Sequence, residues 1–158
     1  SGVSLVNNQV TFKSSKPSVA KIKNNILYAK DNGSYSLTVS LNSNPALSST
    51  ESYVMSGIKK PKTNITSVKS KKKKQITVSW KNNIKNVTGY EIQYSTSKKF
   101  TKKTTKTVTA KGKKAKSKTI SKLKSKKTYY VRIRAYKNQS QGEKFYGKYS
   151  KTLKIKVK

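Results

Sequence analysis

The titratable side chains limit the chemistry available to this chain. Of 158 residues only four are acidic, and none is histidine or cysteine. Those four (Asp31, Glu51, Glu91 and Glu143) are spread over more than 110 residues, whereas general acid–base catalysis needs titratable groups held close together. A Ser–Lys nucleophile is possible on paper, but with 36 lysines such pairs arise by chance. We therefore expect no active site and no enzymatic activity.

Metal and cofactor chemistry is equally poorly supported. The Asp31-Asn32-Gly33 segment is a fragment of a calcium-loop pattern, but the other carboxylates of that pattern are missing. Turn formation explains these three residues better. The lack of cysteine rules out disulfides and thiolate metal sites without fixing the compartment. We expect no metal and no cofactor.

Lysine dominates the composition. The chain carries 38 basic and four acidic residues, a net charge of +34, and only Arg132 and Arg134 are arginine. Residues 1–60 hold seven lysines and two acids (+5), whereas residues 61–158 hold 31 basic residues and two acids (+29). With Gly57 and the KKPK run at 59–62, this shift predicts a domain at 1–58, a linker at 59–62 and a domain at 63–158.

A group of aromatic residues near the C-terminus could contact a ligand. Phe145, Tyr146 and Tyr149 lie in or beside a polar loop at 138–142, and rings next to amide side chains suit a sugar or protein contact. The alternative is that Tyr146 and Tyr149 pack on a sheet edge as ordinary strand residues. We favour this alternative because aromatic residues are common on strands.

The elements that must position these side chains are strands. Ile76, Val78 and Trp80 alternate with polar residues, and so do Tyr90 and Ile92 further along, which is the period of a strand with one buried face. Helix is disfavoured because β-branched residues and Tyr alternate while Ala, Leu and Glu are scarce. Trp80 would supply the largest single buried area, and we take it as the centre of a core.

The same alternation predicts strands throughout both segments. In the second segment we expect them at 63–69, 75–80, 90–95, 104–109, 117–121, 128–136 and 149–157, a spacing typical of a β-sandwich. In the first we expect them at 3–6, 9–12, 19–22, 26–29, 34–41 and, more weakly, 52–55. Strand 128–136 should turn Tyr129, Val131, Ile133 and Ala135 inward and Tyr130, Arg132, Arg134 and Tyr136 outward. No apolar run is long enough to span a membrane.

Residues 10–40 resemble the bacterial immunoglobulin-like (group 2) family. The matching positions are Phe12, Ser14–Ala20, Ile26–Ala29, Gly33 and Leu37–Val39. They cover the later half of such a domain, and Phe12 stands where the family usually has Trp. The resemblance therefore implies either a small, incomplete sandwich or a missing strand supplied by residues 41–58.

Residues 61–158 resemble a fibronectin type III domain. The resemblance is carried by Trp80, by Gly89–Tyr94, by Leu123 with Tyr129 six residues later, by 131–135 and by the tail 145–157. It implies a seven-stranded sandwich. Its structural core would comprise Trp80, Tyr90, Ile92, Leu123, Tyr129, Val131 and Ile133. Members of this family are typically binding or spacing units of cell-surface and extracellular proteins.

The same topology implies that the lysines gather at one end. The loops 70–74, 96–103 and 122–127 would meet where the last strand finishes. We call their lysines the basic pole: Lys71, Lys72, Lys73, Lys74, Lys98, Lys99, Lys102, Lys103, Lys122, Lys124, Lys126 and Lys127. The pole either keeps the surface solvated and the sheet edges unpaired or attracts a polyanion, and both alternatives stay open.

The sequence thus predicts an all-β chain of two tandem immunoglobulin-like sandwiches, secreted or at the cell surface. We expect a noncatalytic module of a Gram-positive-type bacterial protein, acting in adhesion, display or spacing. The alternatives are a module that binds an anionic cell-wall polymer or glycan through the basic pole, and an accessory segment of a larger secreted enzyme. A protein partner is also possible, whereas nucleic acid should bind only nonspecifically and at low salt, because arginine is scarce.

Overall fold

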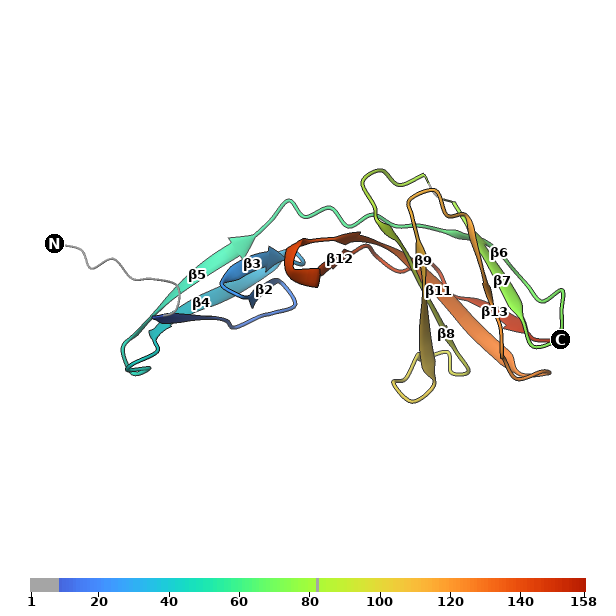
Figure 1. Ribbon diagram of the computed structural model, residues 1–158, viewed down its shortest axis with the longest axis horizontal. Coiled ribbons are helices and arrows are strands. Elements are labelled where there is room, and N and C mark those ends of the chain that lie inside the picture. Colours follow the sequence, from blue (N-terminus) through green and yellow to red (C-terminus); the bar gives the residue numbers. More distant parts are fainter. Residues whose placement is uncertain (1–8, 82) are drawn as a thin grey trace. The chain divides into compact units, whose positions relative to one another are not determined.

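The computed structural model describes residues 9–81 and 83–158. The chain divides into two compact units, Ser1–Lys59 and Lys60–Lys158. Over the described residues the regular structure is β-strand, apart from one short 3-10 turn, η1 (Ser140–Gly142), which confirms the all-β class (Figure 1). No helix in this part of the chain is long and apolar enough to cross a membrane.

The first unit contains two small antiparallel sheets. A three-stranded sheet has the order β1-β4-β5 and a two-stranded sheet has the order β2-β3. Their bounds are β1 (Val10–Ser14), β2 (Ala20–Lys23), β3 (Ile26–Ala29), β4 (Gly33–Leu41) and β5 (Ser48–Met55). Asn24 and Asn25 turn the chain between β2 and β3 at φ of 50° and 57°. Asn tolerates this left-handed conformation, which two-residue hairpin turns require.

The core of the first unit is small. Over residues 9–59 its buried apolar residues are Val10, Val19, Ala20 and Tyr28. Strand β5 is exposed along all but its last residue, so residues 48–55 extend the sheet without covering it. Residues 48–55 form β5, where the sequence predicted a weaker strand at 52–55. The strand predicted at 3–6 lies outside the described residues.

The second unit contains two antiparallel sheets. The first has the order β10-β7-β6, and the second has the order β12-β11-β8-β9, with β13 also paired to β11. Their bounds are β6 (Ile65–Lys69), β7 (Ile76–Trp80), β8 (Gly89–Ser95), β9 (Thr105–Lys111), β10 (Ser117–Ile120), β11 (Thr128–Asn138), β12 (Lys144–Tyr146) and β13 (Leu153–Lys156).

Apolar side chains from both sheets form one core in the second unit. Trp80 on β7 is 3% exposed, and its ring centroid lies 5.3 Å from that of Tyr90 on β8. Ile92 and Ile133, which pair across β8 and β11, are fully buried. All seven residues expected in the core are buried: Trp80, Tyr90, Ile92, Leu123, Tyr129, Val131 and Ile133. Burying each such side chain stabilises the fold by about 1.5–3 kcal/mol.

The last strand, predicted at 149–157, forms over Leu153–Lys156 only. The chain pairs with the C-terminal end of β11 as β12 and pairs with it again as β13. Between them the pairing is irregular: Gly147 N–H donates to the Ala135 carbonyl at 2.9 Å, and Ser150 N–H donates to the Ile133 carbonyl at 2.8 Å. At Gly147 the Pro61 carbonyl approaches so closely that no Cβ would fit. Ser150 then bonds β11 through its side chain, accepting the Ile133 N–H on Oγ at 3.1 Å. Regular strand pairing is therefore interrupted here, but the segment stays bonded to β11.

Tyr136 is also more buried than predicted. Alternation along β11 places it on the outer face with Arg132 and Arg134, yet it is only 4% exposed. The Tyr146 ring packs against it at 6.4 Å, and the Lys144 ammonium lies 4.7 Å from its centroid. Side chains from β12 therefore cover what would otherwise be a solvent-facing ring.

We predict that Ile133→Ala destabilises the second unit by about 2–5 kcal/mol, because it leaves a cavity at a fully buried position. Trp80 is the chain's one tryptophan, so its fluorescence during urea denaturation reports this unit. Lys151→Ala is the control, since Lys151 is an exposed residue of the same unit and its replacement should change stability by less than about 0.5 kcal/mol. If Ile133→Ala lowered the free energy of unfolding by no more than about 0.5 kcal/mol, the core described here would be contradicted.

Candidate binding surfaces

The loop between β10 and β11 is held by two buried residues. Leu123 is 5% exposed and Tyr129 is 8% exposed. The Tyr129 hydroxyl accepts the Lys124 N–H at 3.3 Å, and the Leu123 N–H donates to the Lys74 carbonyl at 3.0 Å. This corner ties the loop both to the core and to the β6–β7 loop. The lysines on either side of Leu123, Lys122 and Lys124, are exposed.

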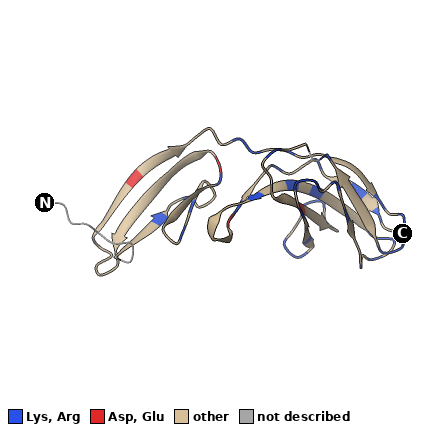
Figure 2. Ribbon diagram, turned by 45° about the horizontal axis from the view of Figure 1, so that its top comes forward, with Lys and Arg blue, Asp and Glu red and all other residues tan. Residues whose placement is uncertain are grey.

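The end of the chain joins the same two loops. Lys126 N–H donates to the Val157 carbonyl at 2.8 Å, and Lys74 N–H donates to the Lys158 carbonyl at 2.9 Å. The hydroxyl of Ser125 also donates to the Lys158 carbonyl, at 2.9 Å. The β6–β7 loop, the β10–β11 loop and residues 157–158 therefore lie together. Figure 2 shows blue lysine segments in the loops near the C-terminus.

A cleft of about 510 Å³ links the β10–β11 loop to the β8–β9 loop. Five lysines line it: Lys103, Lys106, Lys122, Lys124 and Lys127. Tyr94, Leu123 and Tyr129, all buried, lie among its lining residues, together with Thr96 and Thr104. We call this the lysine cleft. Four of its lysines, all but Lys106, belong to the basic pole.

The remaining lysines of the basic pole lie apart from this cleft. Lys98 lines a separate hollow with Val68, Tyr130 and Lys154. The others, Lys71, Lys72, Lys73, Lys74, Lys99, Lys102 and Lys126, are exposed on the three loops. Four of the twelve lysines of the basic pole thus line the lysine cleft, and the other eight lie outside it.

Lys106 was missed by the sequence analysis. It lies on β9 directly opposite Tyr94 on β8, where the two strands pair. The sequence analysis predicted a strand at 104–109 and assigned only loop lysines to the basic pole. The signal that could have found it is the hairpin register, because residues directly opposite one another share a face of the sheet.

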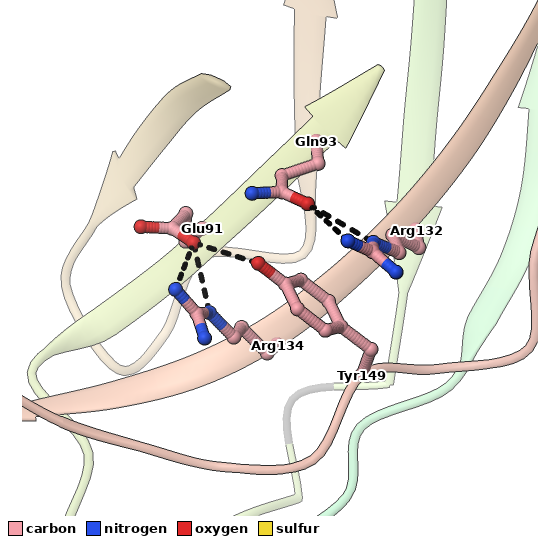
Figure 3. A network of polar contacts seen from close by, with 5 residues as sticks. All are labelled: Glu91, Gln93, Arg132, Arg134 and Tyr149. Atoms are coloured by element: carbon pink, nitrogen blue, oxygen red, sulfur yellow. Dashed lines mark hydrogen bonds and ion pairs between the residues drawn. The ribbon is translucent and has the colours of Figure 1, made fainter. Parts of the chain in front are cut away.

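The arginines form a second cluster, on the outer face of β8 and β11. The Glu91 carboxylate accepts bonds from Arg134 Nε at 2.8 Å and Nη2 at 2.7 Å. Gln93 Oε1 accepts from Arg132 Nε at 3.0 Å and Nη2 at 2.8 Å. The Tyr149 hydroxyl donates to Glu91 Oε1 at 3.2 Å. Figure 3 shows the Tyr149 ring between the two arginines.

Aromatic rings pack against both guanidinium groups. Arg132 Cζ lies 4.1 Å from the Phe100 ring centroid and 4.0 Å from that of Tyr149. Arg134 Cζ lies 3.6 Å from the Tyr146 centroid and 4.5 Å from that of Tyr149. Each such cation–π contact contributes about 0.5–2 kcal/mol, more as it is desolvated. This cluster fastens residues 146–149 to the sheet where regular strand pairing is interrupted.

The predicted aromatic contact site is accordingly not an open platform. Phe145, Tyr146 and Tyr149 are each only partly exposed, and arginines cover the rings of Tyr146 and Tyr149. Packing on the sheet, the alternative we favoured, describes these two tyrosines better than a free stacking surface.

The remaining polar residues weighed for chemistry have structural roles. Asp31 Oδ1 accepts the Asn32 N–H at 2.9 Å, and the Asn32 side chain bonds both backbone groups of Ile58, as expected of a turn. Glu91 pairs with Arg134. Across residues 9–81 and 83–158, no three His, Cys, Asp or Glu side chains gather as a metal site would require.

Two antiparallel sheets packed face to face, with a corner tyrosine bonded to the loop before its strand, define an immunoglobulin-like β-sandwich module. The fibronectin type III domain family matches residues 59–148. The chain therefore belongs to the fibronectin type III family. Domains of this family are generally noncatalytic, typically extracellular, and often mediate protein interactions.

Solved structures agree on the fold. The FN1-FN3 domains of chicken CNTN1 match with 22% identity and a TM-score of 0.53, over 84% of this chain and 45% of that one. The fn3 domain of human contactin 1 matches with 19% identity and a TM-score of 0.51, over 67% of this chain and 86% of that one. The chain spans less than half of the CNTN1 structure. A search of curated proteins finds no match.

Burial raises the pKa of Tyr149 to about 12, and the negative charge of Glu91 adds to the rise while the two arginines oppose it. We predict a matching pH dependence of stability. Between pH 10 and 12 the unfolded chain loses the phenol proton while the folded protein keeps it. The stabilisation contributed by Tyr149 is therefore complete below pH 10 and disappears as the pH rises towards 12.

Urea denaturation of wild type and Tyr149→Phe across this pH range, followed by Trp80 fluorescence, checks the prediction. Lysine deprotonation affects both proteins equally, so it cancels in the comparison. The unfolding free energy of wild type minus that of the variant should decrease from pH 10 to 12. A constant difference would show that the Tyr149 phenol is not held as described.

Proposed function

We propose that this chain is a noncatalytic module of an extracellular or cell-surface protein of Gram-positive-type bacteria, acting in adhesion, display or spacing. The observation that carries the proposal is the fibronectin type III match over residues 59–148, in a unit whose carboxylate Glu91 is consumed by an internal ion pair. The bacterial context rests on the resemblance of residues 10–40 and of the tail 145–157 to bacterial families.

The first unit belongs to the same proposal. Its two small sheets are consistent with a partial immunoglobulin-like sandwich of the bacterial group 2 type, followed by a short linker at 59–62. In that arrangement the chain consists of two tandem sandwiches. It would then serve as a spacer, or as an accessory segment of a longer secreted protein whose catalytic part lies elsewhere.

A second candidate function is contact with an anionic polymer through the basic pole. The lysine cleft favours it, because five ammonium groups line one hollow with no carboxylate among its lining residues. Like charges held together over a poorly polarisable core create a field that concentrates anions. A cell-wall polymer or glycan that carries repeating negative charge would suit this end of the module.

Retention on purified, protein-free bacterial cell walls distinguishes the two candidates. If the basic pole is functional, we predict retention at about 0.15 M salt, where the Debye length is about 8 Å, and release at about 1 M salt. Release already at about 0.15 M salt would dismiss the polymer contact and leave the spacing function.

A further inference from the structure

We propose that the lysine cleft is a binding site for a non-aromatic polymer bearing tetrahedral anions, namely phosphodiesters or sulfate esters. The inference rests on the anionic-polymer contact proposed above and makes it specific. It places binding in the cleft lined by Lys103, Lys106, Lys122, Lys124 and Lys127, and not in the dispersed charge of the whole basic pole.

The cleft has fixed walls. On the β8–β9 side, the Thr104 hydroxyl lies 2.8 Å from those of both Ser95 and Thr101, and Phe100 N–H donates to the Ser97 carbonyl at 3.1 Å. On the other side, the loop is fixed through the backbone of Leu123 and Lys126, as described above. The lysine stems therefore start from ordered backbone, which lowers the entropic cost of bringing their charges onto one ligand.

The charged groups that line the cleft are all lysine ammonium groups, and this favours a tetrahedral anion as the ligand. Arginine is the side chain that matches a planar carboxylate with two parallel bonds, and both arginines of this chain are engaged on the outer face of β8 and β11. The cleft offers only ammonium groups, which act as point charges without a preferred plane. A phosphodiester or a sulfate ester suits them, because its oxygens accept bonds from several directions.

The aromatic residues of the cleft argue against nucleic acid. Single-stranded nucleic acids bind through rings on which the bases stack. Tyr94 and Tyr129 are each 8% exposed, and their rings pack on one another at 6.2 Å. They contribute to the floor of the cleft and offer no free face. A polymer of sugar or polyol units can bind without an exposed aromatic ring, because it has no bases to stack.

The size of the cleft is that of a ligand site. At about 510 Å³ it falls within the roughly 300–1,000 Å³ range of small-molecule sites in proteins. A single inorganic ion would leave most of it empty, whereas a short run of polymer could engage several of the five lysines together. We therefore expect affinity to increase with chain length and inorganic phosphate to compete weakly.

The test compares two variants with equal loss of charge. The cleft variant carries Lys103→Gln, Lys106→Gln, Lys124→Gln and Lys127→Gln. The control variant carries Lys71→Gln, Lys72→Gln, Lys73→Gln and Lys99→Gln, all in the same three-loop region or its edge. Each has a formal net charge of +30 in place of +34 (34 − 4). Both leave Lys74 and Lys122 intact, because these lie at positive φ.

Binding is measured by fluorescence anisotropy with labelled poly(glycerol phosphate) and with a labelled sulfated oligosaccharide, at about 0.15 M salt. We expect the cleft variant to bind at least about tenfold more weakly than wild type and the control variant less than about threefold more weakly. The two polymers distinguish a phosphate source from a sulfate source. Trp80 fluorescence during urea denaturation verifies that both variants remain folded.

Three other outcomes overturn part or all of the proposal. Equal losses in the two variants would assign binding to the basic pole as a whole and refute the cleft. Binding of oligo-dT or polyglutamate as tight as that of the two polymers would refute the ligand class. No binding of either polymer by wild type would refute the anionic-polymer function itself, and the cleft with it.

Discussion

The burial of Leu123 and Tyr129 at the corner before β11 is the constraint on which the charged end of this protein depends. These two side chains fix the β10–β11 loop to the core, and the backbone of the same loop bonds both the β6–β7 loop and the last residues of the chain. Leu123 is flanked by Lys122 and Lys124, and both of these lysines are exposed. Apolar packing thus decides where the positive charge accumulates.

Lysine and arginine have different roles in this protein: the arginines make contacts within the sheet, and the lysines carry the surface charge. The guanidinium groups of the two arginines donate hydrogen bonds to Glu91 and Gln93, and aromatic rings pack against their faces. Both arginines thereby stabilise the sheet. This use suits a planar, weakly hydrated group. The lysines, with flexible stems and strongly hydrated heads, remain at the surface. A net charge of +34 is therefore compatible with a compact sandwich, because the repelling charges stay in water.

The sequence predicted the all-β class, and the strands around Trp80 and on β11 were placed to within a few residues, because a period of two is visible locally. It did not predict the interruption between β12 and β13. At that break Pro61, which is remote in sequence, approaches Gly147 closely. The contact of Tyr149 with Glu91 and the position of Lys106 opposite Tyr94 were missed for the same reason. Pairings between distant residues follow from strand register, and register is not visible in one strand alone.

Amide hydrogen exchange of the second unit tests the central claim most directly. Leu123 and Lys126 lie in a lysine-rich loop, yet both N–H groups donate to carbonyls of other segments. If the corner is fixed as described, these two amides should exchange at least about a hundredfold more slowly than unbonded loop amides. Exchange of these two amides at the rate of unbonded loop amides would contradict the claim, because the loop that carries the lysines would then not be fixed.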